Sequence, residues 1–307
     1  MGGGSIGARH ARNLIALGAD VTVTDPDPSR AAALSLPSVP LDLDRLDGYE
    51  GVVVASPTAR HLEQARAALA TGARVLVEKP LAASGDGLAD VIGSDRLMVG
   101  YNLRFHEPLR RVVGLVRDGA AGQVSSVRVW FGSWLPDWRP AVDYRDTYSA
   151  RADLGGGVLL DAIHELDLLV WLCGPDEFRV VGAVVDRIGP LEIDVEDTVR
   201  AVLRHPDGTV AEVALDYLSR RYRRGIEVIG DRATVRFDWA RKVVEVEDAV
   251  QVRAEEDATP ISRSYELEAE HFLAFVAGRA APPVDGPAAA ASIRLADDIR
   301  RAAGCLS

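Results

Sequence analysis

The sequence predicts an α/β fold with two domains, an N-terminal doubly wound parallel sheet and a C-terminal α+β domain on an open, mainly antiparallel sheet. The chain has 307 residues, which exceeds what a single hydrophobic core usually holds. Up to about residue 120, short apolar strands alternate with helical patterns, as in βαβ units. Beyond that point strand follows strand between turns. We therefore expect domains at 1–120 and 121–307.

The composition is that of an ordinary folded protein, with 48% hydrophobic residues and a formal net charge of −11. Such a negative charge argues against binding to nucleic acid. No apolar run approaches the length of a membrane span, and no signal peptide is visible, so we expect a cytoplasmic protein without a membrane partner. Cys173 and Cys305 are the only cysteines, too few for a disulfide framework or a cysteine-based metal site, and no metal is expected.

Three glycines at the start of the chain, Gly2, Gly4 and Gly7, fit the pattern G-x-G-x-x-G. A helical pattern begins at Ile6 and stops at Gly18. The first two glycines permit a tight turn and a close approach of the pyrophosphate, and the third lets helix pack on strand. The pattern predicts a Rossmann dinucleotide site in which Ser5 and Ile6, at the helix N-terminus, also face the phosphates. For the glycines alone, a flexible N-terminus is the alternative.

An acid follows at the distance that this motif requires. A short strand at 21–24 ends in Asp25, eighteen residues after Gly7. Such a carboxylate accepts the ribose hydroxyls and repels a 2′-phosphate, which favours NAD. Arg30 is close enough in sequence to accept that phosphate, so NADP stays open. The glycine motif should also follow a strand, whereas only Met1 precedes it, and we expect the first strand to be missing and the natural start to lie upstream.

The next strand, 51–55, ends at Ser56, Pro57 and Thr58, and His61 opens a helix that runs to Gly72. Ligands of open α/β sheets bind outside the carboxyl ends of the strands. We therefore expect Pro57 and Thr58 to contact the nicotinamide half of the cofactor, and Ser56 and His61 to belong to the cofactor site. His61 as a simple helix-start residue is the alternative.

The strand 75–77 runs directly into Glu78, Lys79 and Pro80. At this strand end Lys79 would stand at the reactive end of a ligand, with Glu78 beside the cofactor. A Lys-Pro bond can also be cis, which would fix the direction of the lysine. A surface lysine where the strand leaves the sheet is the alternative.

Two further segments carry candidate substrate residues. The strand 97–100 is followed by a polar group that suggests substrate contact, or else a solvated turn. The irregular segment 133–154 is rich in tryptophan, tyrosine and arginine, which suits a polyhydroxylated or anionic ligand, although an oligomer contact would use the same residue types. The candidates are Tyr101, Asn102, Arg104, His106, Trp138, Arg139 and Tyr144.

Three glycines at 155–157 lead into a predicted helix at 158–172. Asp161 and His164 are three residues apart and would share one face of that mostly apolar helix. Buried acids and imidazoles are costly unless they are paired, so the two residues indicate a site. An internal cap or hydrogen bond is the alternative.

The remaining segments predict the second sheet and two closing helices. Only those two helices follow the strands, so one sheet face is expected to lack cover and to mediate self-association. The acidic run at 255–257 is interpreted as a solvated loop. Strands are expected at 124–131, 178–185, 198–204, 210–217, 225–229, 234–238 and 243–247, and helices at 86–92, 267–277 and 288–302.

Taken together, these residues resemble the glucose–fructose oxidoreductase, inositol dehydrogenase and rhizopine-catabolism family of nicotinamide-dependent oxidoreductases. The resemblance covers nearly the whole chain. It rests on the glycine motif with its acid, on the segments Ala55–Thr58, Glu78–Pro80 and Gly100–Arg104, and on the glycines before Asp161 and His164.

The resemblance implies hydride transfer between NAD(P) and a carbinol of a sugar, polyol or sugar derivative by a homodimer or homotetramer. It implies that His164 is the general acid/base, that Asp161 orients its ring, and that Lys79 binds the reacting oxygen. Typical members place the histidine four positions after the acid, and this chain places it three positions after, so His164 matches better than Asp161.

Two alternatives stay open. One is an NAD-dependent glycoside-cleaving enzyme with only transient oxidation, and the other is a non-catalytic sugar- or nucleotide-sensing protein on the same scaffold. The presence of both Lys79 and His164 argues against the sensor, because a pure binder does not need both.

Overall fold

The computed structural model describes residues 1–174 and 178–305 and divides the chain into two compact units. The first unit combines Met1–Phe105 with Pro260–Ala290, and the second combines His106–Thr259 with the residues from Ala291 onward. The expected boundary after residue 120 remains a prediction about folding domains. By packing, the C-terminal segment 260–290 belongs to the first unit, because its helix covers the first sheet.

The first unit is built on three parallel strands in the order β1-β2-β3. These are short, apolar and largely buried, as strands covered by helices on both faces must be. The predicted strand at 21–24 is reduced to one isolated bridge between Val23 and Ser38. The elements of this unit are β1 (Gly51–Val54), β2 (Arg74–Glu78), β3 (Leu97–Gly100), α1 (Ser5–Ala16), α2 (Pro28–Ala33), η1 (Thr58–Arg60), α3 (His61–Ala70), α4 (Ala89–Ile92), η2 (Asn102–Phe105) and α8 (Ile261–Val276).

Backbone hydrogen bonds place Met1 and Gly2 against this sheet. Gly2 N donates to Thr24 O at 2.8 Å, and Ala55 N donates to Met1 O at 2.7 Å. The glycine motif therefore begins beside the carboxyl end of β1, where a Rossmann fold places its phosphate-binding turn.

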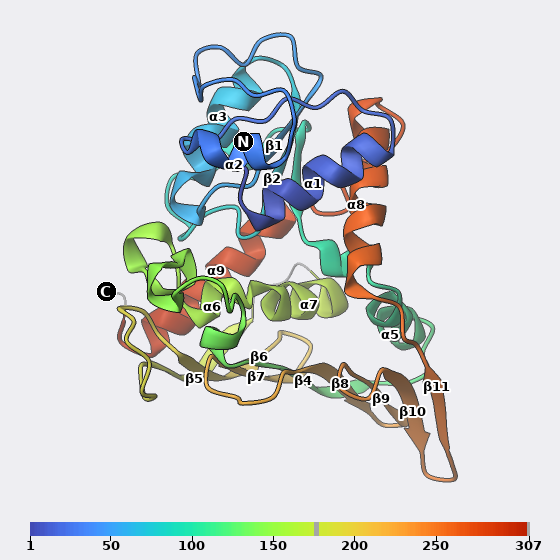
Figure 1. Ribbon diagram of the computed structural model, residues 1–307. Helices are drawn as coiled ribbons and strands as arrows, with labels where there is room; N and C mark the ends of the chain where they lie inside the picture. Colours follow the sequence, from blue (N-terminus) through green and yellow to red (C-terminus); the bar gives the residue numbers. More distant parts are fainter. Residues whose placement is uncertain (175–177, 306–307) are drawn as a thin grey trace. The chain divides into compact units, whose positions relative to one another are not determined.

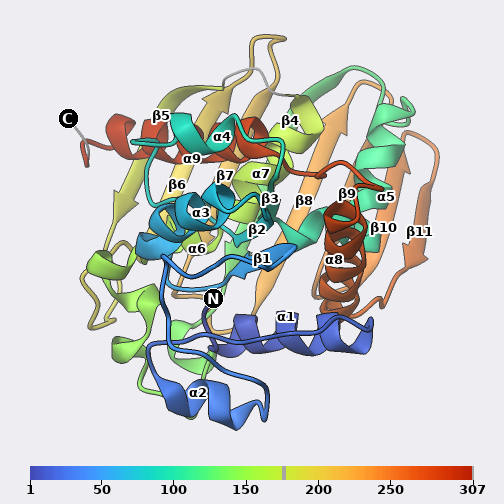
Figure 2. The same ribbon diagram turned by 90° about the horizontal axis from the view of Figure 1, so that it is seen from above.

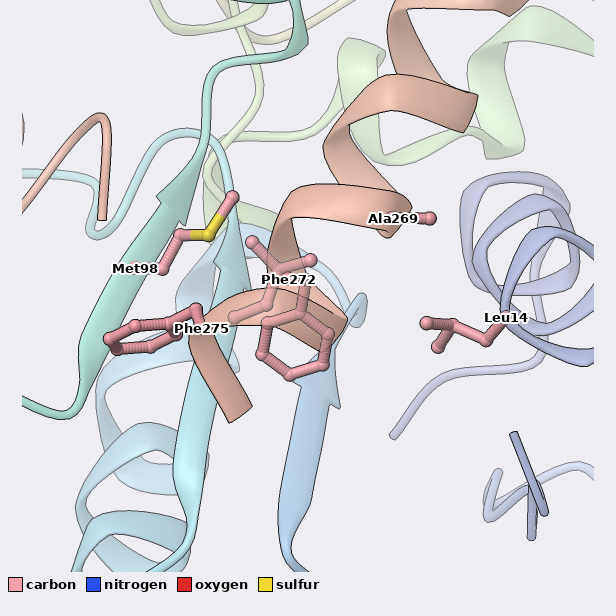
Figure 3. Close-up of a cluster of buried hydrophobic side chains, with 6 residues drawn as sticks. Leu14, Met98, Ala269, Phe272 and Phe275 are labelled. Carbon is pink, nitrogen blue, oxygen red and sulfur yellow. The ribbon is translucent and has the colours of Figure 1, made fainter. Parts of the chain in front are cut away.

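Helix α8, far away in sequence, completes the core of the first unit. Figure 3 shows Phe272 and Phe275 of α8 beside Met98 of β3, with Leu14 of α1 reaching the same cluster. Each of these side chains is at most 8% exposed. Burial of one such side chain contributes about 1.5–3 kcal/mol, so α8 is an essential part of this unit.

The second unit is an eight-stranded sheet in the order β11-β10-β9-β8-β4-β7-β6-β5. β4 and β7 pair in parallel and the other neighbours are antiparallel, which confirms the mainly antiparallel sheet. Helices α5, α6 and α7 cover one face (Figures 1 and 2). The elements are β4 (Val124–Gly132), β5 (Arg179–Asp186), β6 (Thr198–Arg204), β7 (Val210–Asp216), β8 (Arg223–Gly230), β9 (Ala233–Asp238), β10 (Val243–Asp248), β11 (Val252–Glu256), α5 (Glu107–Arg117), α6 (Val158–Asp161) and α7 (Ile163–Cys173). The last helix is α9 (Gly286–Ala302), whose part from Ala291 onward belongs to this unit.

A row of alternating charges crosses the other face of this sheet. Arg128 of β4 is paired in register with Glu212 and Glu227, at 3.3 and 3.1 Å. Its neighbours Val127 and Val129 are buried, so Arg128 points away from the helices. The row continues to Arg236 and Glu245 on one side and meets Val202, which is 42% exposed, on the other. This face is polar at its centre and partly apolar toward β6.

Several predictions about single elements were wrong. Glu255 lies in the edge strand β11, not in a loop, and all five residues of β11 are exposed. An edge strand carries charges that prevent further pairing, and this composition is also typical of a solvated loop. The predicted helix at 86–92 shortens to α4, and α5 was not anticipated.

The segment 133–154 contains only short 3-10 turns, in agreement with its predicted irregularity: η3 (Leu135–Asp137), η4 (Tyr144–Asp146), η5 (Tyr148–Ala150) and η6 (Ala152–Leu154). No helix in residues 1–174 and 178–305 is long and apolar enough to span a bilayer.

Candidate active site

The glycine motif of the first unit forms an open turn in front of α1. Gly2 has a φ of +96°, and a Cβ on Gly7 would lie 1.8 Å from Gly2 O, so only glycine permits this contact. Gly4 is the N-cap of α1, with no side-chain cap, and a Cβ added there would meet nothing within 4 Å. The N-terminus of α1, which starts at Ser5 and Ile6, therefore has open space beside its N-cap, as binding of a pyrophosphate by first-turn N–H groups requires.

Asp25 lies beside this turn and its side chain is buried. Its carboxylate accepts hydrogen bonds from Gly3 N at 2.7 Å and from Asp27 N at 2.8 Å, which fix its orientation. Arg30 Nη1 is 3.7 Å from Asp25 Oδ2, and the Arg30 side chain is 56% exposed. A fixed carboxylate fits the ribose hydroxyls of NAD. The glycine turn and Asp25 therefore fit the dinucleotide, and Arg30 is placed where it partly offsets the charge of Asp25.

Behind the end of β1, His61 connects two loops. Its Nδ1 is 2.7 Å from Pro80 O, and its Nε2 is 2.8 Å from Ser56 O. Burial lowers the pKa of His61, in spite of these contacts. Thr58 is buried in η1, and Pro57 precedes it. The structure thus gives His61 a scaffolding role at this strand end, while cofactor contacts of residues 56–58 and 61 stay predictions.

Lys79 follows β2 directly, and the Lys79–Pro80 peptide is cis, one of the two forms that the sequence left open. The preceding residue, Glu78, is buried and its Oε2 accepts a hydrogen bond from Lys79 N at 3.2 Å. Its Oε1 lies 2.6 Å from His10 Nε2. Burial alone would raise the pKa of Glu78, but the contacts with His10 and Lys79 more than offset this and lower it. Glu78 is therefore a buried carboxylate that holds the backbone of the candidate catalytic lysine.

The polar group after β3 is mostly used for packing. Tyr101 is fully buried, Asn102 Nδ2 donates to Ser264 Oγ at 2.7 Å, and Arg104 Nη1 donates to Pro283 O at 3.3 Å. These bonds attach segment 260–290 to the first sheet.

His106 belongs to the second unit, where its ring stacks on Trp239 at 4.4 Å. Burial lowers its pKa to about 4. Substrate contact by these four residues stays a prediction.

In the second unit, the single helix predicted at 158–172 is broken. Asp161 ends α6, and Ala162, with φ −96° and ψ 27°, separates it from α7, whose first turn carries His164. The argument that both residues share one continuous helical face was therefore wrong. His164 is 6% exposed.

Two tyrosines bind the carboxylate of Asp161. Tyr217 Oη donates to Asp161 Oδ2 at 2.6 Å, and Tyr148 also hydrogen-bonds Asp161. Burial, and then the Asp161 charge, raise the pKa of both phenols, so they stay protonated donors. Asp161 is thus fixed in place by Tyr148 and Tyr217, and its proposed role toward His164 stays a prediction.

The residue after His164 makes a buried ion pair that the sequence did not indicate. Glu165 accepts two hydrogen bonds from Arg224, at 2.6 and 3.0 Å, and the Glu165 side chain is completely buried. Arg224 also lies over the rings of Phe131 and Trp239. The signal for Glu165 was an acid in an apolar helix, but nothing distinguished Arg224 from its neighbouring arginines.

The irregular segment 133–154 places Trp138 and Arg139 against the two tyrosines that bind Asp161. Trp138 is edge-on to Tyr217 at 5.3 Å, and its Nε1 donates to Ser133 Oγ at 2.8 Å. Arg139 lies over the ring of Tyr148 at 5.4 Å. Tyr144 accepts a hydrogen bond from Glu192 N at 3.1 Å. The structure therefore groups Trp138 and Arg139 with the tyrosines around Asp161.

Both parts of the chain match family models. Residues 1–93 match a model described as an oxidoreductase family with an NAD-binding Rossmann fold. Residues 109–236 match a model described as the GFO/IDH/MocA C-terminal domain.

Curated relatives and solved structures agree with these models. The chain is 33% identical over 233 residues to dTDP-3,4-didehydro-2,6-dideoxy-alpha-D-glucose 3-reductase of Streptomyces antibioticus, covering 72% of this chain and 67% of the relative. It is 30% identical over 314 residues to inositol 2-dehydrogenase of Acidothermus cellulolyticus, covering 94% and 86%. The crystal structure of GenD2 from gentamicin A biosynthesis, in complex with NAD, aligns with a TM-score of 0.84 and 26% identity over 99% of this chain and 92% of that chain. The chain therefore belongs to the GFO/IDH/MocA family of oxidoreductases, and its N-terminal part is an NAD-binding Rossmann domain.

Proposed function

We propose that this protein transfers a hydride between NAD and a carbinol carbon of a sugar, polyol or sugar derivative. The observation that carries the proposal is Lys79, held by Glu78 at the end of β2 in the unit that also contains the dinucleotide-binding turn. The names of the relatives, an inositol dehydrogenase and a reductase of a nucleotide-linked sugar, support this substrate class.

Different residues of the first unit would bind different parts of the cofactor. The turn of Gly2, Gly4 and Gly7 with the N-terminus of α1 would hold the pyrophosphate, and Asp25 would hold the ribose hydroxyls. When bound, NAD supplies the acceptor of the hydride that leaves the carbinol carbon. Lys79 would donate a hydrogen bond to the reacting oxygen and stabilise the negative charge that develops there.

In the second unit His164 would accept the hydroxyl proton, since an imidazole titrates near working pH. Asp161 would orient its ring, with its own carboxylate fixed by Tyr217 and Tyr148. Trp138 and Arg139, grouped with these tyrosines, would contact the hydroxyl groups or an anionic group of the substrate.

The test is hydride transfer, followed by absorbance of the reduced nicotinamide with a panel of sugars and polyols. Lys79→Met should lower kcat by orders of magnitude while the Kd for NAD changes little. Lys242→Met is the matched control, because Lys242 is exposed and is the only other lysine. A Lys79→Met variant within a few-fold of the parent would remove the lysine from the mechanism.

The base is tested in the same assay. His164→Ala should lose about 10²–10⁴-fold in kcat, and part of this loss should return at higher pH, where hydroxide replaces the base. If Asp161→Asn is silent while His164→Ala is not, the tyrosine-bound carboxylate does not orient the imidazole.

Glycoside cleavage through transient oxidation is the second candidate, and absence of net cofactor reduction while a glycoside is consumed would favour it. A cytoplasmic location and self-association through the exposed face of the second sheet are also part of the proposal. The apolar Val184 and Val202 on that face support self-association.

A further inference from the structure

Three titratable residues from distant parts of the sequence meet inside the first unit. His10 lies on α1, Glu78 at the end of β2, and Glu268 on α8 (Figure 2 shows α1 beside α8). One nitrogen or oxygen atom of each lies within 4.8 Å of the others. Their exposed fractions are 2%, 6% and 0%. Charged side chains are buried together in this way only when their charges are balanced.

The hydrogen bonds of the three residues are unequal. His10 Nε2 and Glu78 Oε1 are 2.6 Å apart, and Glu78 Oε2 binds Lys79 N. Within the described residues, neither carboxylate oxygen of Glu268 has a hydrogen-bond partner. Two ionised carboxylates at this separation in a buried site would repel each other strongly. Something must neutralise Glu268, and the candidates are a cation and a proton.

The geometry favours the proton. Two donor atoms bound to one tetrahedral Zn²⁺, at bond lengths of about 2.1 Å, stand roughly 3.4 Å apart. The 2.6 Å separation of His10 Nε2 and Glu78 Oε1 is instead that of a short, charge-assisted hydrogen bond. Burial, and then the charge of Glu78, raise the pKa of Glu268 well above its ordinary value.

We propose that Glu268 is a positioning residue for Lys79: it stays protonated, so that Glu78 carries the only negative charge of the cluster and holds the backbone of the lysine. This role rests on the proposed function of Lys79, whereas the proton on Glu268 does not. Loss of the proton would place a second charge beside Glu78 and disturb the strand end.

Other charged groups lie on the elements packed around this cluster. Arg9 and Tyr265, stacked on each other, belong to α1 and α8. Arg104 lies in η2, which packs on α8, and His61 lies on α3, which packs on β2. The experiment must separate the ionisation of Glu268 from the influence of these groups and of Lys79, and a substitution at Glu268 alone achieves this.

The first measurement is Tm against pH for the wild type and for Glu268→Gln, which keeps the shape and cannot ionise. The unfolded chain releases this proton near pH 4.5, whereas the folded chain retains it. Wild-type stability should therefore fall relative to Glu268→Gln as the pH rises above about 4.5. We expect the Tm advantage of Glu268→Gln to grow by about 4 °C or more between pH 5 and pH 8. Glu270→Gln, an exposed position on the same helix, should show no such trend.

The second measurement is kcat and KM against pH. Glu268→Gln should keep kcat at pH 7 within threefold and extend the alkaline limb of kcat to higher pH, with KM unchanged. A purely structural glutamate would not move this limb. Glu78→Gln removes the neighbouring charge. In that background, the growth with pH of the Tm advantage that Glu268→Gln confers should be smaller than in the wild type.

Each outcome decides one part of the inference. A Tm difference that does not change with pH would overturn the proton on Glu268, and so would a stoichiometric metal in the wild type that Glu268→Gln loses. A Tm trend with an unchanged kcat profile would overturn the positioning role. An active Lys79→Met variant would remove the proposed function of the lysine and leave the Tm result intact.

Discussion

Replacement of Gly4 by alanine tests the dinucleotide-binding turn at one atom. Gly4 has φ −64° and ψ −171°, which alanine adopts without strain, and the added methyl group would meet no atom within 4 Å. Alanine is a poorer N-cap than glycine, so we expect a loss of about 0.5–1 kcal/mol in stability. This corresponds to a fall in Tm of about 1–4 °C. The variant should therefore fold normally.

The effect on cofactor binding should be much larger. The methyl group would occupy the space in which we expect the first N–H groups of α1 to meet a bound pyrophosphate. Loss of one hydrogen bond to a charged group costs about 1.5–3 kcal/mol, which raises the Kd for NAD about tenfold to 150-fold. Calorimetric titration with NAD measures this change directly.

Two companion variants define what the result means. Gly93→Ala adds a methyl group in equally open space at the end of α4, and its Kd for NAD should stay within twofold of the parent. In Gly7→Ala the Cβ would have to move 1.2 Å, from 1.8 to 3.0 Å from Gly2 O, so both Tm and affinity should fall. If folded Gly4→Ala binds NAD within threefold of the parent, the open space in front of α1 is not the pyrophosphate site.

Two further predictions concern the cofactor and the assembly. We expect kcat/KM with NAD to exceed kcat/KM with NADP, because the Asp25 carboxylate repels a 2′-phosphate. Asp25→Ser should make the two values of kcat/KM more similar. Equal values of kcat/KM for the parent protein with both cofactors would show that Arg30 neutralises Asp25. We expect light scattering at micromolar concentration to give a mass above that of the monomer. Val202→Glu, which places a second acid beside Glu212, should lower this mass. The same change at Val39, which is also exposed, should leave the mass unchanged. A monomeric parent would contradict the assembly.

Local steric rules explain why parts of the site could be predicted. The glycine turn and Asp25 follow from what a close backbone contact and a ribose require within a short stretch of chain. The position of Lys79 at the end of a strand could be predicted because a short apolar run directly precedes Glu78 and Lys79. Each of these features depends on residues that are close together in the chain, so the sequence alone is enough to predict it.

The missed features depend on partners that are distant in sequence or on a break that its own residue does not signal. Glu268 lies 190 residues after Glu78, and Arg224 lies 59 residues after Glu165, so no spacing pattern connects them. The helix break falls on Ala162, although alanine is the best helix former. At this break Asp161 accepts a hydrogen bond from Tyr217, 56 residues later in the chain, and hydrophobic periodicity carries no information on such a distant contact.

The placement of α8 has a consequence for how the protein is made on the ribosome. The three strands of the first sheet are complete by Gly100, but the helix that buries Met98 and Leu14 is translated only after Pro260. The nascent dinucleotide-binding unit must therefore wait with an apolar surface uncovered while the whole second sheet is synthesised. Because residues from Pro260 onward, roughly the last sixth of the chain, complete the core of the first unit, we expect cofactor binding to be a late event in the life of each molecule.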